Sequence, residues 1–151
     1  MVQKNMNKYR SHLCSELSIK DLGNKVTLSG WADTIRDHGN LIFIDLRDNY
    51  GITQCVIDGS HSHFKEISKL DNESVLTISG EVLRRSDDTI NKNLQTGEIE
   101  IQIQDYKILS KSEILPLPVN SDIEYGEEIR LKYRFLDLRR NKLHKNILLR
   151  N

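Results

Sequence analysis

The sequence predicts an all-β fold with one short helix, in which a five-stranded barrel is followed by a hinge and a helical C-terminal tail. Three observations predict this fold. Segments that alternate apolar and polar residues recur between residues 26 and 104, and one short segment among them, residues 62–70, has helical spacing instead. Both prolines and a basic helical pattern come after residue 110. Three strands, a helix and two strands are the order of an OB-fold, whose open face and loops bind oligonucleotides.

The first three strands are predicted to form an antiparallel meander. Residues 26–32 alternate apolar and polar side chains, and a turn at residues 36–40 leads into the strand of residues 41–47. A tight turn at residues 48–51 then leads into residues 52–57.

The pattern changes at residues 62–70, where apolar side chains three residues apart predict a short amphipathic helix. Strands resume at residues 75–83, and a polar loop of residues 84–97 leads to the last strand, residues 98–104. This last strand has the cleanest alternation, with glutamates and glutamines facing water. Its core face holds Ile99, Ile101 and Ile103.

Two glycines support closure into a barrel. Gly30 and Gly80 lie inside the first and fourth strands, where a small barrel must bend sharply. Another small β-barrel or a half-sandwich would also fit this order of elements.

The barrel is predicted to occupy residues 1–110, followed by a hinge at residues 111–125 that contains Pro116 and Pro118. Residues 126–151 have a helical pattern. One helical face is expected to hold Leu131, Phe135 and Leu138, before an interruption at Asn141. Because the second helical stretch is still running at residue 151, we expect the chain to be part of a longer protein.

The composition is that of an ordinary water-soluble domain, with 37% hydrophobic and 29% charged residues. No apolar run reaches the roughly 20 residues of a membrane helix, and no signal region follows the N-terminus, so we expect a cytoplasmic protein. Cys14 and Cys55 lack the spacing of a disulfide framework or a zinc site. We expect both to be plain thiols.

The net charge is zero, but it is unevenly distributed along the chain. Residues 130–151 hold eight Lys and Arg against a single acid, Asp137, and the rest of the chain has an excess of acids. Bulk charge therefore gives the predicted barrel no general affinity for nucleic acid. Binding by the barrel would depend on local placement.

The outer face of residues 41–47 carries the candidate binding residues. The core face holds Ile42, Ile44 and Leu46. Phe43 is therefore on the outside, where an aromatic ring can stack on a base, although packing under a loop is an alternative. Arg36 and Arg47 can contact phosphates or bases nearby, and Gln54 offers a donor and an acceptor to a base edge. Simple solvation is the alternative for these three side chains.

The loop of residues 84–93 mixes cations with amides and joins the last two strands. This is one of the two loops with which an OB-fold grips its ligand. Its composition alone would equally suit a solvated loop.

No known catalytic motif is present, because the sequence lacks a Gly-rich phosphate loop, HExxH and GxSxG. The histidines form no ligand-spaced set apart from His61 and His63, which are expected to be exposed in a turn. We assign no catalytic residue and no metal ligand.

Several segments together resemble the N-terminal anticodon-binding domain of bacterial aspartyl-tRNA synthetases. These segments are Leu28–Trp31, Arg36–Gly39, Leu41–Asp48, Thr96–Glu100 and Arg130–Arg140. The likeness covers nearly the whole chain from Tyr9, and the last segment is the most specific. Lysyl- and asparaginyl-tRNA synthetases share the barrel, but their sequences differ after the hinge.

The resemblance implies that Phe43 stacks on an anticodon base, while Arg36 and Gln54 contact its neighbours. Arg85, Asn91 and Glu100 would complete the RNA-binding pocket. Leu83 and Thr89 depart from the family, whose members often carry Arg and Asn at these positions, so some loop contacts are expected to differ.

The resemblance also implies a longer parent enzyme, an aspartate–tRNA ligase. It would use ATP and magnesium to form aspartyl-adenylate and pass the aspartyl group to tRNA. These steps would take place beyond Asn151, in a catalytic domain that residues 126–151 begin. No cofactor is expected in this chain itself. We expect the chain to be a monomer or weak dimer, although the resemblance implies a homodimeric parent enzyme.

Two positions bear on which tRNA is read. Relatives that charge only the aspartate tRNA often have leucine at the position of His38, and relatives that also accept the asparagine tRNA often have histidine. A second position linked to this relaxed reading is Asp88, where relatives often have glycine. The resemblance therefore predicts a non-discriminating parent enzyme. A histidine can donate or accept a hydrogen bond, which suits either pyrimidine at the base that differs.

Two other functions remain open from the residues alone. A free-standing OB-fold that binds single-stranded nucleic acid would have no use for the hinge and the unfinished helix. A protein-interaction barrel would leave Phe43 and the loop cations without a role.

Overall fold

The computed structural model describes residues 7–150, and the chain divides into two compact units, Met1–Ser112 and Glu113–Asn151. We refer to them as the barrel unit and the C-terminal unit. The strands of the barrel unit are β1 Lys25–Asp37, β2 Leu41–Arg47, β3 Ile52–Asp58, β4 Val75–Arg84 and β5 Ile99–Ser110. Its short helices are η1 Ile19–Asp21, α1 Phe64–Ile67 and η2 Asp87–Thr89.

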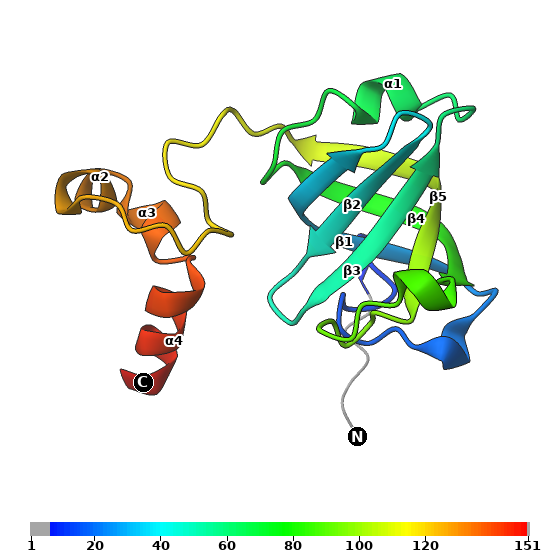
Figure 1. Cartoon of the computed structure of the whole chain (residues 1–151), viewed down its shortest axis with the longest axis horizontal. Coiled ribbons are helices and arrows are strands. Elements are labelled where there is room, and N and C mark those ends of the chain that lie inside the picture. Colours follow the sequence, from blue (N-terminus) through cyan, green and yellow to red (C-terminus); the bar gives the residue numbers. More distant parts are fainter. Residues whose placement is uncertain (1–6, 151) are drawn as a thin grey trace. The chain divides into compact units, whose positions relative to one another are not determined.

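The five strands close into a barrel in the order β1-β2-β3-β5-β4, with β4 pairing back onto β1 (Figure 1). The pairing of β3 with β5 is parallel, and all other pairs are antiparallel. The predicted OB-fold barrel and its order of elements are therefore confirmed. β1 and β5 are longer than predicted, reaching Asp37 and Ser110.

The core lies inside the barrel, as the alternation predicted. Ile42, Ile44 and Leu46 of β2 point inward and are fully buried, and they pack with the inward isoleucines of β5. Cys14 and Cys55 belong to the same core and are free thiols, as expected. Desolvation by burial raises the pKa of both thiols far above the ordinary value, so both stay protonated at neutral pH.

Gly30 and Gly80 allow neighbouring strands to approach closely. A Cβ at Gly30 would lie 2.2 Å from the carbonyl oxygen of Arg47, and one at Gly80 would lie 2.1 Å from that of Gln102. No side chain fits such a space, so both positions require glycine for the barrel to keep this shape.

The predicted helix of residues 62–70 is shorter in the structure, where α1 spans Phe64–Ile67 and lies across one end of the barrel (Figure 1). Ile67 is fully buried, while Phe64 and Leu70 pack against the core. The helix closes that end of the barrel.

The C-terminal unit contains α2 Glu127–Lys132, α3 Arg134–Asp137 and α4 Asn141–Arg150. The predicted single helical face is not formed, because Leu131 and Phe135 lie on separate helices, α2 and α3, where they are 60% and 66% exposed. The helix breaks at Tyr133, whose backbone is not helical (φ −109°, ψ 44°). The prediction had continued one helix through this residue. The predicted second helical stretch is present as α4, which begins at Asn141 after a break that follows α3.

The proline-containing segment contributes side chains to a second hydrophobic core. Leu117 and Val119 are buried together with Leu136 of α3, which gives the C-terminal unit a small core of its own. No helix within residues 7–150 is long and apolar enough to cross a membrane.

Candidate nucleic-acid interface

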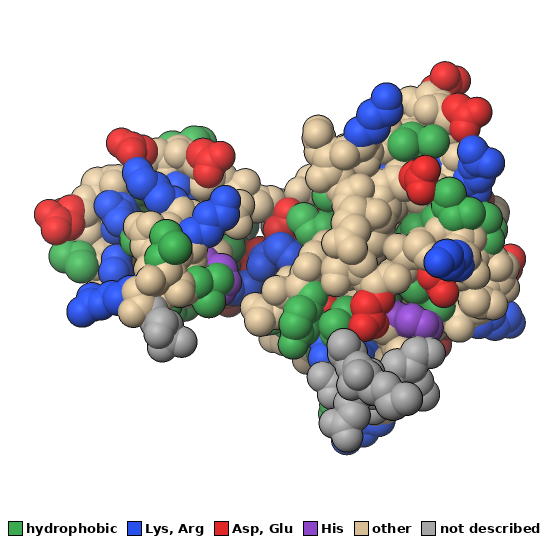
Figure 2. All heavy atoms as spheres, turned by 90° about the horizontal axis from the view of Figure 1, so that it is seen from below, with side chains coloured by type: hydrophobic (Ala, Val, Ile, Leu, Met, Phe, Trp, Pro, Cys, Tyr) green, Lys and Arg blue, Asp and Glu red, His purple; other side chains and the backbone are tan. Residues whose placement is uncertain are grey.

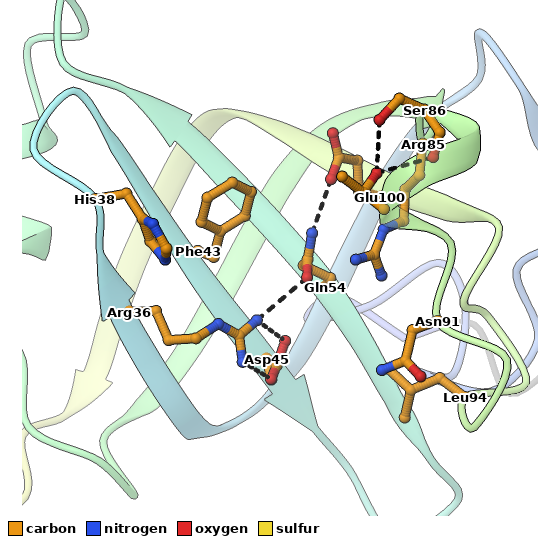
Figure 3. A pocket seen from close by; sticks show the side chains of 11 residues that line it. Arg36, His38, Phe43, Asp45, Gln54, Arg85, Ser86, Asn91, Leu94 and Glu100 are labelled. Atoms are coloured by element: carbon orange, nitrogen blue, oxygen red, sulfur yellow. Dashed lines mark hydrogen bonds and ion pairs between the residues drawn. The ribbon is translucent and has the colours of Figure 1, made fainter.

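An open pocket of about 520 Å³ lies on the outer face of the barrel, between the strands β1, β2, β3 and β5 and the loop that joins β4 to β5 (Figure 3). It is lined by Arg36, His38, Phe43, Asp45, Gln54, Arg85, Ser86, Thr89, Asn91, Leu94 and Glu100. Strands form its floor and the loop forms one wall.

An irregularity in β1 places Arg36 on this outer face. Ala32 pairs with Leu46 and the next paired residue, Thr34, faces Asp45, so Asp33 is an extra residue in the ladder. A bulge of one residue moves every later side chain to the opposite face. Arg36 therefore lies opposite Phe43, on the outside of the barrel.

A chain of hydrogen bonds crosses the floor of the pocket. Arg36 donates to both carboxylate oxygens of Asp45, at 2.6 and 2.9 Å, and also to Oε1 of Gln54 at 3.2 Å. Gln54 donates from Nε2 to Glu100 at 2.8 Å. The hydrogen bond to Asp45 raises the pKa of Arg36 above its already high value, so the guanidinium stays charged. The network fixes the orientation of the Gln54 amide.

Phe43 forms the apolar wall of the pocket. The imidazole of His38 meets the Phe43 ring edge to face, with the ring centroids 5.4 Å apart and the planes at 89°. Phe43 is half-buried rather than freely exposed. His38 packs against one side of the Phe43 ring, and the rest of the Phe43 ring stays available for stacking within the pocket.

Arg85 brings buried donors without partners to the pocket. Its Nε and Nη1 atoms are buried, and neither has a hydrogen-bond partner within the described part of the chain. Figure 3 shows the guanidinium of Arg85 directed into the pocket, with Gln54 between it and Phe43. Buried donors without partners are costly, so an acceptor on a ligand would be bound favourably here.

The β4–β5 loop is held in one shape by its own backbone. The Asn91 N–H donates to the Gly97 carbonyl at 3.1 Å, and the Gly97 N–H donates to Leu94 at 3.1 Å. Thr96 ties the loop to the start of β3, because its hydroxyl donates to the Ile52 carbonyl at 2.6 Å. Asn91 and Leu94 are thereby fixed at the edge of the pocket.

The structure brings together seven of the nine candidate binding residues that the sequence singled out. These are Arg36, His38, Phe43, Gln54, Arg85, Asn91 and Glu100. Asp88 is exposed in η2 and does not line the pocket, although its neighbour Thr89 does. Their roles in binding stay predictions.

The sequence interpretation gave no site role to Asp45, Ser86 or Leu94, which also line the pocket. Asp45 could have been found, because it shares the outer face of β2 with Phe43. Leu94 carried no such signal, since only the folded loop places it there.

The suggestion that Arg47 contacts RNA near Phe43 is not supported. Its Nε donates to Asp33 at 2.6 Å and its Nη2 to Glu73, and its guanidinium lies 5.6 Å from the Trp31 ring centroid. Desolvation alone would lower the pKa of Arg47, but the two carboxylates raise it overall. Arg47 does not line the pocket and is part of a structural ion cluster.

His61 and His63 are half-buried, not exposed as expected. The His63 ring packs against Tyr106 at 5.0 Å, and its Nε2 lies 3.9 Å from a carboxylate oxygen of Asp105. Within residues 7–150, no three His, Cys, Asp or Glu side chains gather in a way that could hold a metal ion.

A family model described as an OB-fold nucleic acid binding domain matches residues 26–109, which cover the five strands except for the first residue of β1 and the last residue of β5. The chain belongs to this family. The fold and the pocket of this OB-fold domain agree with that membership, since both place the candidate residues on the face where such domains bind nucleic acid.

Curated relatives are similar over nearly the whole chain. The aspartate–tRNA(Asp/Asn) ligase of Pelagibacter ubique is 60% identical over 146 residues, which are 97% of this chain and 25% of the relative. The ligase of the same name from Bartonella tribocorum is 57% identical over 96% of this chain and 24% of its own length. The chain thus spans about a quarter of the curated relatives it matches.

A solved structure is also similar. The asparaginyl-tRNA synthetase of Pyrococcus horikoshii, solved with asparaginyl-adenylate, matches with a TM-score of 0.73 and 27% identity. The match covers 94% of this chain and 30% of that one. In this comparison too, the chain corresponds to a part of a longer protein.

Proposed function

We propose that this OB-fold domain reads the anticodon of tRNA as the N-terminal part of an aspartate–tRNA ligase. The observation that supports the proposal most directly is the pocket itself. It combines the stacking surface of Phe43, the fixed amide of Gln54 and the unpartnered donors of Arg85. Stacking with hydrogen bonds to base edges is how proteins read single-stranded RNA.

The proposal assigns a separate task to each side chain. Phe43 stacks on one anticodon base, and Arg36 and Gln54 contact neighbouring bases. Arg85, Asn91 and Glu100 complete the pocket. Because Arg36 and Arg85 are balanced by Asp45 and Glu100, the pocket has no net charge, so recognition depends on directed hydrogen bonds rather than on bulk attraction.

The parent enzyme would form aspartyl-adenylate from aspartate and ATP, with magnesium, and would then transfer the aspartyl group to tRNA. These reactions belong to the part of the enzyme that residues 126–151 begin. The names of the two curated relatives described above support this assignment, since both are named aspartate–tRNA(Asp/Asn) ligase.

The test is a binding titration of the 151-residue chain with anticodon stem-loops for aspartate, asparagine and an unrelated amino acid, at one stated salt concentration. We expect saturable binding of the first two and not of the third. Equal weak binding of all three would contradict anticodon reading and would favour a general single-strand binder. The Phe43→Ala variant should lose affinity on the order of 10-fold or more for the first two, because base stacking contributes about 1–3 kcal/mol.

His38 is proposed to permit both tRNAs. Its imidazole lines the pocket beside Phe43, where it can either donate or accept a hydrogen bond. We expect His38→Leu to weaken binding of the asparagine stem-loop more than that of the aspartate stem-loop. Equal affinities in the variant would remove His38 from the mechanism while leaving anticodon reading intact.

A further inference from the structure

We infer that Leu94 packs against the face of an anticodon base, and that this base is not the one proposed to stack on Phe43. The inference rests on the proposed function and deepens it, because the ligand is the same anticodon loop. Leu94 belongs to the β4–β5 loop and lines the pocket. It would be a second base-packing residue, on the wall of the pocket that the loop forms.

Leu94 and Phe43 are the apolar members of a pocket lining that is otherwise polar. Figure 3 shows the two side chains on opposite sides of the pocket, with Gln54 between them. Because a polar side chain separates the two apolar surfaces, a single base is not held between them. Two bases can each contact an apolar surface, while the polar floor is directed at their edges.

The side chain of Leu94 is half-buried, but it does not contribute to the core of the barrel. Among the described residues, neither the buried core nor the partly buried apolar side chains packed against it include Leu94. An apolar side chain that faces an open pocket is removed from water only when a ligand covers it. Binding of a base against Leu94 is therefore favourable.

The backbone holds Leu94 in place before any ligand binds. Its N–H donates to the Asn91 carbonyl at 3.1 Å, and its carbonyl accepts from the Gly97 N–H at 3.1 Å. With both backbone groups bonded inside the loop, the residue does not have to be ordered by the RNA. A contact that is formed in advance loses less entropy on binding.

Asn91 gives the same wall of the pocket a hydrogen-bond donor. Its Oδ1 accepts from the Asn93 N–H at 3.0 Å, and Figure 3 shows the nitrogen of the amide turned toward the pocket, beside Leu94. A base whose face lies on Leu94 would meet this donor at its edge. An apolar contact to the face together with a directed hydrogen bond to the edge is how unstacked bases are recognised.

The alternative is that Leu94 only closes the loop and contacts no base. Closure has other causes, namely the backbone hydrogen bonds and the absence of a side chain at Gly97, where a Cβ would lie 1.8 Å from the Asn91 carbonyl oxygen. None of these requires an apolar side chain at position 94. The leucine side chain is therefore free to serve a ligand.

The charge of the barrel unit also favours direct contacts with bases. Figure 2 shows Lys and Arg side chains interspersed with Asp and Glu over the visible face of the barrel unit. Such a surface provides little general attraction to phosphates. The affinity is therefore expected to come from local contacts, including the apolar ones.

The experiment is a set of double-mutant cycles in which one change is made in the protein and the other in the RNA. The ligands are the aspartate anticodon stem-loop and three versions of it, each with an abasic site at one anticodon position. The protein variants are Leu94→Ala, Leu94→Met and Phe43→Ala. The matched control is Leu109→Ala, which removes the same atoms from a residue that is 40% exposed and outside the pocket. Affinities are measured at one stated salt concentration.

We expect Leu94→Ala to lower the affinity for the intact stem-loop on the order of 5-fold, because much of the apolar contact with the base is removed. This loss should disappear with the stem-loop that is abasic at one position and persist with the other two. The effect of Phe43→Ala should disappear at a different position. Leu94→Met keeps an apolar side chain of similar volume and should bind like the wild type, as should Leu109→Ala.

An equal loss with all four ligands would overturn the inference, and so would a loss that disappears at the position coupled to Phe43. The melting temperature of Leu94→Ala should match that of Leu109→Ala, since neither residue belongs to the core. A clearly lower value for Leu94→Ala would assign Leu94 to the fold and would also overturn the inference. The proposed function fails separately, if the wild-type chain does not distinguish the aspartate stem-loop from an unrelated one.

Discussion

Arg36 is the side chain on which the polar network of the pocket depends. It contacts Asp45 through two hydrogen bonds and Gln54 through a third. Because Gln54 in turn donates to Glu100, the position of Arg36 sets the orientation of the amide that is proposed to read a base. Asp45 acts through Arg36 and is therefore a positioning residue.

Replacing Asp45 with asparagine should weaken RNA binding without unfolding the barrel. The amide would keep the shape of the side chain but lose the charge-assisted pairing, so Arg36 would no longer be held in one orientation. We expect the affinity for the aspartate stem-loop to fall on the order of 10-fold, or about 1.4 kcal/mol. Asp105→Asn is the matched control, since Asp105 is exposed and outside the pocket. Equal affinity in the two variants would contradict the positioning role.

The two buried thiols make the stability of the barrel decrease with rising pH in the alkaline range. Burial raises the pKa of Cys14 and Cys55, whereas the unfolded chain has thiols of pKa about 8.5. Above that pH the unfolded state releases protons that the folded state retains, so stability is full below about pH 8.5 and falls as the pH rises. The expected slope is up to about 1.4 kcal/mol per pH unit for each thiol.

Urea unfolding under reducing conditions at several pH values between about 7.5 and 10 measures this slope. The variant Cys14→Ala/Cys55→Ala serves as the reference, because it lacks both thiols. The difference in slope between the two chains isolates their contribution from that of lysines and tyrosines. Parallel curves would show that the thiols do not carry the dependence.

Among the elements, the β4–β5 loop shows how backbone packing shapes a binding edge. Gly97 is buried in that loop, and a Cβ there would lie 1.8 Å from the carbonyl oxygen of Asn91. The loop therefore owes its tight closure to the absence of a side chain. Asn91 and Leu94 are placed at the pocket by the same closure.

We expect Gly97→Ala to displace the loop and to lower the affinity for the stem-loop. Overpacking of this kind costs about 1–3 kcal/mol. The melting temperature and the affinity should both fall. Gln95→Ala changes an exposed residue of the same loop and should leave both unchanged. If Gly97→Ala binds RNA like the wild type, the loop does not form the wall of the site.

At the scale of the whole molecule, the two units have separate cores of very different size. The barrel unit buries a large cluster of aliphatic side chains. Among the described residues of the C-terminal unit, the buried members of its own cluster are Leu117, Val119 and Leu136. Stability increases with the apolar area that is buried. We therefore expect the C-terminal unit to unfold at a lower temperature than the barrel.

Leu136→Ala should lower the melting temperature of the C-terminal unit and leave that of the barrel unit unchanged. Replacing a buried leucine with alanine lowers the free energy of unfolding by about 2–5 kcal/mol, which is a large loss for a core this small. Trp31, the single tryptophan, lies in β1 and reports on the barrel by fluorescence, while the signal at 222 nm follows α2–α4. Leu149→Ala, at a residue that is 86% exposed, is the control. One common transition that shifts as a whole would contradict two independent units.

The sequence by itself determined the barrel. Alternation of apolar residues set the faces of β2 and β5, because a strand that buries one face must place alternate side chains inside. It also identified seven residues that line the pocket, some by their position on the outer face and others by resemblance to a family. The sequence was sufficient for the strands because the alternation of apolar residues and the residues that favour turns are properties of short segments.

Only the tertiary structure decided the rest. The extra residue Asp33 reverses the faces of β1 and so brings Arg36 outward, which no alternation pattern within β1 could show. Arg47 is held in an ion cluster by Asp33 and Glu73, and Arg85 lacks hydrogen-bond partners for two buried nitrogens within the described residues. Sequence patterns give periodicity along the chain, whereas partners distant in the sequence are chosen only when the strands and loops pack together.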